Sequence, residues 1–148
     1  MGHIEYTKTM TATPEALWAV VGNPNTWGDW FSIHDRWMEE PPATLAVGDR
    51  LVAKVVMLGM ANKFEWNVVA VAAPSKLTLG ATGMAGVKIE FTFSISPRDT
   101  IAGAGSELSL RGDFEGALIK GALGKAVEKD GMKQLATSLD ALDTLAAA

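Results

Sequence analysis

Alternating hydrophobic and polar residues predict β-strands at the start and in the middle of the chain. Residues 3–10 place Ile4, Tyr6 and Met10 on one side and polar residues on the other, as in a half-buried strand. The same period of two recurs between Gly- and Pro-containing turn signals at residues 50–58, 63–73, 76–82, 87–96 and 106–114. We expect 97–99 and 103–105 to form the turn before the last strand. Consecutive strands with short connections favour an antiparallel meander with one face toward water.

Two short helices are predicted after the first strand. Thr13 can cap a helix, Pro14 suits its first turn and Glu15 faces the positive end of its dipole. This helix should stop at Gly22. The Asn23-Pro24 pair then repeats the cap-plus-proline signal, so a second short helix should run to about Trp30.

Helical spacing of apolar residues predicts one long helix over residues 116–145. The apolar positions are Leu118, Ala122, Ala126, Met132, Leu135, Leu139 and Leu142, and no proline interrupts them. At 1.5 Å per residue the helix should be about 40 Å long. Its first half is rich in small residues and its second half in leucine.

The order of these elements predicts an α+β fold in which a curved antiparallel sheet of about seven strands wraps around the terminal helix. The apolar face of such a sheet must be buried, and one helix cannot cover all of it. We therefore expect a cavity between the sheet and the small-residue half of the helix. The early helix pair should close one end of it.

Four of the five tryptophans lie between residues 18 and 37, where glycine and Asn-Pro break regular structure. Large rings gathered at such breaks suggest the rim of a hydrophobic pocket. The predicted ligand-binding residues are Trp30, His34, Trp37, Met57, Phe64, Trp66, Phe91, Phe93, Leu118 and Ala122. The alternative for each aromatic residue is an ordinary core position.

His34 is the candidate catalytic residue, because a pocket histidine can act as an acid or base near neutral pH. Asp29 and Asp35 flank it and could orient its ring. The alternatives are a loop histidine bonded to backbone, and acids that cap helices or face solvent.

Composition narrows the function classes. A chain of 148 residues fits one domain, residues 1–148, and its apolar content of 48% suits a globular protein. There is no apolar run of about 18 residues and no secretory signal, so we expect a cytoplasmic protein without a membrane span. With no cysteine and only His3 and His34, we expect no metal site. The net charge of −4 and scattered basic residues argue against nucleic-acid binding.

Two glycine-rich stretches lack the spacing of cofactor motifs. Residues 80–86 do not match the dinucleotide fingerprint, and residues 116–126 lack the serine or threonine of a phosphate loop. We therefore expect no cofactor.

The element order, residues 11–30, Gly48 and the terminal helix resemble the START-like superfamily, also called SRPBCC, which has the helix-grip fold and includes polyketide cyclases, dehydrases and lipid-transport proteins. A closer similarity is to an actinobacterial branch, some of whose members are described as toxins of type II toxin–antitoxin systems. The residues that carry it are Trp30, Ile33, His34, Trp37, Gly59, Met60, Asn62, Trp66, Gly83, Gly86, Val87 and Lys88.

The resemblance implies a cavity for a hydrophobic or amphipathic ligand and no shared catalytic residue. The leading hypothesis is a protein, monomeric or homodimeric, that binds or transports a lipid or a polyketide-like molecule. The alternatives are a cyclase or dehydratase that uses His34 as acid or base, and a toxin of a toxin–antitoxin pair.

Overall fold

A single seven-stranded sheet forms the body of the protein in the computed structural model, which describes residues 2–57, 59–83, 86–101, 103–116 and 121–147. The strands are β1 (Gly2–Met10), β2 (His34–Trp37), β3 (Arg50–Met57), β4 (Met60–Ala72), β5 (Lys76–Thr82), β6 (Lys88–Thr100) and β7 (Gly103–Glu115). The helices are α1 (Pro14–Val21), the 3₁₀ turn η1 (Pro24–Thr26), α2 (Trp27–Trp30) and α3 (Gly121–Ala147).

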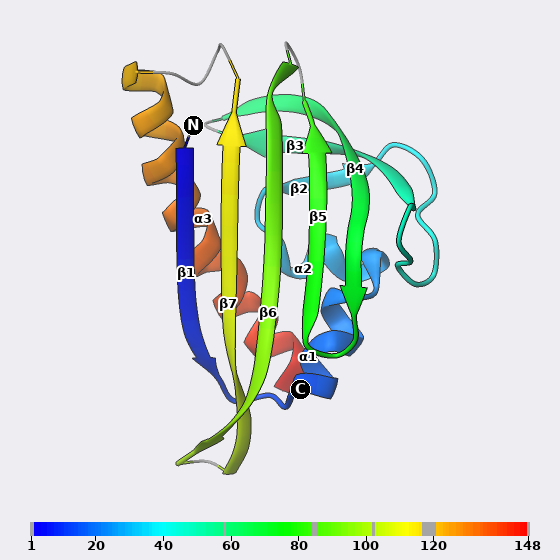
Figure 1. Cartoon of the computed structure of the whole chain (residues 1–148), viewed down its shortest axis with the longest axis vertical. Helices are drawn as coiled ribbons and strands as arrows, with labels where there is room; N and C mark the ends of the chain where they lie inside the picture. The colour runs from blue at the N-terminus through cyan, green and yellow to red at the C-terminus, as the bar shows by residue number, and fades with distance from the viewer. Residues whose placement is uncertain (1, 58, 84–85, 102, 117–120, 148) are drawn as a thin grey trace.

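Every neighbouring pair in the sheet is antiparallel, in the order β1-β7-β6-β5-β4-β3-β2. The long helix α3 crosses behind the sheet and packs against β1, α1 and α2 (Figure 1). The α+β fold, with a curved sheet around a C-terminal helix and short helices after the first strand, is therefore confirmed.

The two predicted helix starts are formed as the sequence indicated. The Ala16 amide donates to Thr13 Oγ1 at 3.3 Å, and the Asn25 amide donates to Asn23 Oδ1 at 3.1 Å. These bonds satisfy amide groups that have no partner within a helical turn. They set the position of the segment that carries Trp27 and Trp30.

The expected turn at residues 97–99 and 103–105 is wrong, because both segments continue the β6–β7 hairpin. Pro97 pairs with Ser106, and pairing extends to Thr100 and Gly103. The register between β6 and β5 ends at Ser94, so beyond it β6 has one strand neighbour in the described sheet. A proline is tolerated at such an edge because it removes no bond to a second neighbour.

A second correction concerns the strand that carries His34, which the period-two patterns did not predict. His34 is the first residue of β2 and pairs with Val55 of β3. The pattern was hard to read because the strand has only four residues and a register shift between His34 and Arg36.

The second half of α3 is tied to the start of the chain by side-chain bonds. The Asp143 carboxylate accepts hydrogen bonds from the amides of Thr11 and Ala12 at 3.0 and 3.1 Å. Lys8 Nζ lies 3.0 Å from Asp140 Oδ1, and this ion pair raises the pKa of Lys8. These contacts hold the second half of α3 against β1 and the residues that follow it.

Candidate functional site

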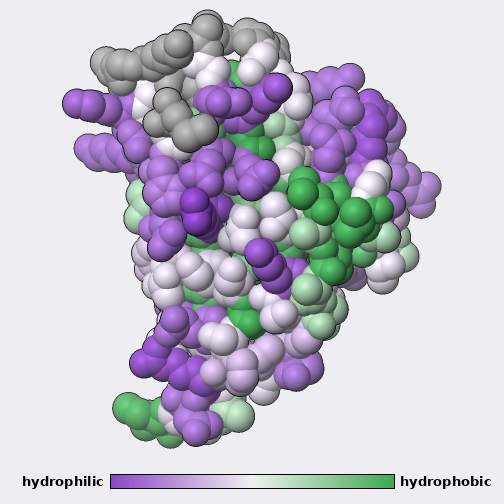
Figure 2. Space-filling view, in the orientation of Figure 1, coloured by the Kyte–Doolittle hydropathy of each residue, from purple (hydrophilic) through white to green (hydrophobic). Residues whose placement is uncertain are grey.

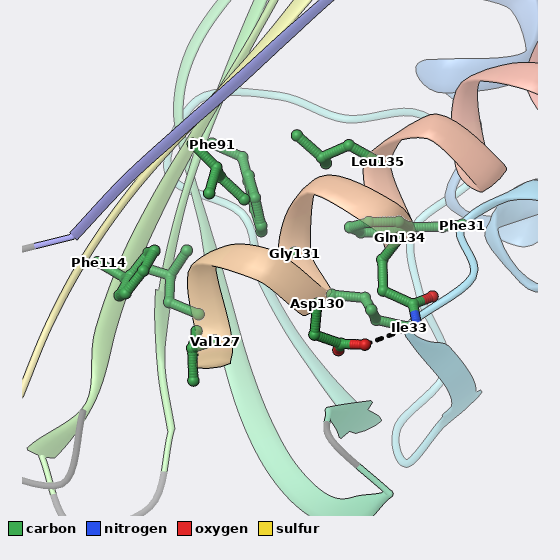
Figure 3. A pocket seen from close by; sticks show the side chains of 11 residues that line it. Phe31, Ile33, Phe91, Phe114, Val127, Asp130, Gly131, Gln134 and Leu135 are labelled. Atoms are coloured by element: carbon green, nitrogen blue, oxygen red, sulfur yellow. Dashed lines mark hydrogen bonds between the residues drawn. The ribbon is translucent and has the colours of Figure 1, made fainter. Parts of the chain in front are cut away.

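The cavity between the sheet and α3 is small, with a volume of about 30 Å³. Figure 3 shows most of its lining, which comprises Ile4, Phe31, Ile33, Ile89, Phe91, Phe114, Val127, Asp130, Gly131, Gln134 and Leu135. A water needs about 10–15 Å³ of such space, whereas pockets for small-molecule ligands measure roughly 300–1,000 Å³. A lipid-sized guest would have to displace lining side chains.

Aromatic rings fill the space around Trp27. Trp27 is fully buried, and its ring has Trp30, Phe31, His34, Trp37 and Trp66 as neighbours, with centroids 5.2–6.3 Å away. The cavity predicted beside the small-residue half of the terminal helix falls largely on residues 117–123, whose side chains lie outside the described structure.

The predicted aromatic residues do come together in one cluster. Through Trp27, Trp66 and Trp30, ring contacts connect all of Trp30, His34, Trp37, Phe64, Trp66, Phe91 and Phe93. Of this set, Phe91 also lines the cavity. The cavity therefore lies beside the cluster, next to the stacked pair of Trp30 and Phe31, whose centroids are 5.2 Å apart.

Three predicted ligand-binding residues cannot be placed against this site. Leu118 lies outside the described residues. For Met57 and Ala122 the structure describes the backbone but not the side chain. Their role stays a prediction.

Sequence reasoning did not select several lining residues that the structure brings together. Ile4, Ile89 and Phe114 occupy the apolar positions of period-two strands, so their inward direction was readable. Phe31 and Ile33 alternate with Ser32 in the segment between α2 and β2, which was the available signal. That this segment folds back onto α3 depends on the tertiary structure.

His34 is half-buried beside Trp37, with ring centroids 4.6 Å apart. Its Nδ1 is buried and has no hydrogen-bond partner in the described structure. Burial lowers the pKa of His34 below its ordinary value of 6.5, and the nearby Asp35 opposes this change. The neutral imidazole is therefore favoured at neutral pH.

Neither flanking acid orients the His34 ring. Asp35 Oδ2 lies 3.5 Å from Lys54 Nζ, and Asp29 is exposed. Among the described residues, no hydrogen bond joins either carboxylate to the imidazole. The base-orienter pair of an acid–base catalyst is not assembled here.

Trp66 carries a second unpaired polar atom. Its side chain is fully buried, yet its Nε1 has no hydrogen-bond partner in the described structure. A buried donor without a partner costs about 1–3 kcal/mol. The aromatic cluster thus holds a free donor at Trp66 and a free ring nitrogen at His34.

Hydrogen bonds of Ser32 hold the segment between α2 and β2 against α3, and we call these bonds the latch. The Ser32 amide donates to Ser138 Oγ at 3.0 Å, and the Ser32 hydroxyl donates to Gln134 Oε1 at 2.6 Å. Because Phe31 and Ile33 both line the cavity, this latch holds two of its walls in place.

The outer face of the sheet holds a wider and more polar hollow of about 530 Å³. Its lining mixes Lys88 and Arg111 with Glu90, Asp113 and Glu115, and Figure 2 shows this face as largely hydrophilic. His3 Nδ1 lies 2.6 Å from Asp113 Oδ1, and this bond lowers the pKa of Asp113. Arg111 Nε lies 3.4 Å from the Oδ2 atom of Asp113 on the same strand.

The described residues also bear on two other kinds of site. No group of three or more His, Cys, Asp or Glu side chains is arranged there to hold a metal ion. Among the described helices, none combines the length and the apolar character that crossing a membrane requires.

Proteins of similar sequence include two from Mycobacterium tuberculosis strains, named Toxin Rv0910 and Toxin MT0934. Each is 27% identical over 114 residues, which cover 77% of this chain and 76% of the relative. These names describe the relatives.

Solved structures with the same fold include protein CV1439 from Chromobacterium violaceum, with a TM-score of 0.74 and 13% identity over 100% of this chain and 99% of that one. A START superfamily protein from Mycobacterium smegmatis has a TM-score of 0.71 and 17% identity over 95% of both chains. Residues 1–147 match the family described as Polyketide cyclase / dehydrase and lipid transport. Over nearly its whole length, the chain therefore belongs to that family.

Proposed function

We propose that this protein binds a hydrophobic or amphipathic small molecule between the sheet and α3. The observation that carries the proposal is the cavity lining, in which every side chain apart from Asp130 and Gln134 is apolar or, at Gly131, absent. Burial of apolar ligand surface would contribute about 25 cal/mol per Å². Membership of a family described by cyclases, dehydrases and lipid transport supports the same role.

Because a volume of about 30 Å³ is too small for such a ligand, binding requires the cavity to widen. The segment that carries Phe31 and Ile33 is the wall best suited to move, since the bonds that latch it to α3 in the described structure come from one residue, Ser32. Movement of this segment would also shift Phe31 away from Trp27 and Trp66, next to the unpaired atoms of the cluster. The predicted ligand-binding residues Trp30, Trp66 and Phe91, which contact the Phe31 ring, would then border the enlarged site.

Binding of Nile red, a neutral apolar dye, tests the proposal together with native mass spectrometry of freshly purified protein. Val127→Phe places a ring in the cavity, whereas Met132→Phe places one on the exposed face of the same helix, where Met132 is 37% exposed. We expect saturable dye binding that Val127→Phe weakens about tenfold, as steric filling of a small pocket should. Met132→Phe should bind like the wild type.

Two results would overturn the proposal. One is the absence of both a co-purified small molecule and saturable dye binding. The other is equal binding by the two phenylalanine variants, with thermal unfolding showing that both are folded.

A toxin function is the second candidate, and the names of the mycobacterial relatives favour it. It predicts growth arrest when the chain is expressed, and rescue by the product of a neighbouring gene. Normal growth at high expression would exclude it.

A further inference from the structure

We propose that the ligand of this cavity is an amphipathic molecule whose polar end donates hydrogen bonds, such as an amine or an alcohol, and that Asp130 accepts them. The inference rests on the proposed function and specifies its ligand class. Fatty-acid carboxylates, which offer only acceptors at neutral pH, would be poor ligands.

The polar groups of the cavity lie together at its solvent side. Asp130 and Gln134 are half-buried, one helical turn apart on α3, while apolar lining residues such as Phe31, Phe91 and Leu135 are 2–5% exposed. Figure 3 shows the two polar side chains side by side near Ile33. A ligand with its apolar part inside would therefore present its polar end to Asp130.

The hydrogen bonds of Gln134 determine which groups remain for a ligand. Its Oε1 accepts from the Ser32 hydroxyl at 2.6 Å, and its Nε2 donates to Asp130 Oδ1 at 3.5 Å. The reverse amide orientation would set Oε1 against the Asp130 carboxylate, so this network fixes the orientation. The Nε2 donor is directed at Asp130. The groups left for a ligand at the mouth of the cavity, which is its solvent side, are therefore mainly hydrogen-bond acceptors.

The Asp130 carboxylate can accept more hydrogen bonds than the described residues donate to it. An ionised carboxylate accepts about four hydrogen bonds. Within the described residues, Asp130 takes one long bond from Gln134 and no ion pair. Lys129 and Lys133 are its nearest basic neighbours along α3, and both are exposed, outside the cavity lining. The mouth is thus an anionic acceptor rather than a site for an anion.

Competition against bound Nile red tests the ligand class with three probes of equal chain length: decylamine, decanol and decanoate, each below its micelle concentration. We expect decylamine and decanol to displace the dye at concentrations about tenfold lower than decanoate, because hydrogen bonds to a charged group are the stronger kind. Asp130→Asn should bring the three probes close together.

A control is needed because a protein of net charge −4 attracts cations everywhere. Asp29→Asn removes the same charge at an exposed position away from the lining and should keep the wild-type preference. Equal displacement by the amine and the carboxylate, or equal effects of the two variants, would overturn the inference. Saturable dye binding in the same experiment would still leave the proposed function standing, whereas its absence would remove both.

Discussion

At the scale of single residues, Trp27 lies at the centre of the aromatic cluster. Its ring has five aromatic or imidazole neighbours, and its Nε1 donates to the Val21 carbonyl at 3.1 Å. We expect Trp27→Ala to lower the free energy of unfolding by about 3–5 kcal/mol, the usual cost of deleting a buried large ring. Urea unfolding measures it, with the half-buried Trp18→Ala as the milder comparison. A loss below that of Trp18→Ala would contradict the central role of Trp27.

His34 should make stability depend on pH in a specific window. Since burial lowers its folded-state pKa, the unfolded chain binds the proton more readily below pH 6.5, and stability falls as the pH drops through that value. Below the folded-state pKa the loss should level off. The carboxyls with lowered pKa values, Glu65 and Asp113, lose their contribution only further down, below 4.5 and 3.8.

Urea midpoints of the wild type and His34→Gln, compared between pH 7.5 and 5, measure this effect. The wild type should lose more stability over that range than the variant does. Parallel curves would show that His34 is not desolvated in the folded protein. A drop confined to the region below pH 4.5 would point to the carboxyls instead.

Among the elements, the segment between α2 and β2 depends on its bonds to α3. Ser138 is fully buried, and Ser138→Ala leaves the Ser32 amide without its acceptor. We expect a loss of about 1–3 kcal/mol and faster hydrogen exchange at residues 31–34. Thr144→Ala removes an exposed hydroxyl that bonds Asp140 within the same helix, so it should leave that exchange unchanged. Unaltered exchange in Ser138→Ala would exclude the latch.

Two glycines in contact with Ile4 predict opposite effects of alanine. A Cβ at Gly131 in α3 would meet the flexible end of Ile4 at 2.9 Å, and alanine is about 1 kcal/mol better than glycine inside a helix. Gly131→Ala should therefore stabilise the protein slightly. A Cβ at Gly112 in β7 would lie 2.8 Å from the Phe91 ring and 3.1 Å from Ile4 Cγ1, so Gly112→Ala should destabilise it. Thermal unfolding compares the pair, and the opposite order would refute the packing argument.

At the scale of the whole molecule, the first strand is bound both to the last strand and to the terminal helix. β1 pairs with β7, and Asp143 of α3 bonds the residues that follow β1. Tryptophan fluorescence, from the aromatic cluster, and far-ultraviolet circular dichroism should therefore report the same unfolding midpoint. Separate midpoints would show that α3 and the sheet unfold independently.

Local patterns were sufficient for much of this protein, because period-two strands, capped helices and a proline-free terminal helix depend on neighbouring residues. They indicated the α+β architecture, the two helix starts and the inward faces of the strands, including Phe91 and Phe93. The β6–β7 extension past Pro97 was not readable, since it depends on which strands lie alongside. The short strand at His34 is set by pairing with β3.

The sequence by itself determined the fold class and the gathering of aromatic rings around residues 27–37. Only the tertiary structure decided how much space those rings leave, because packed volume depends on how side chains from distant elements interlock. It also brought Ser32 to Ser138 and set Asp130 at the mouth of an apolar cavity. These contacts join residues about a hundred positions apart along the chain, and no local pattern encodes such pairings.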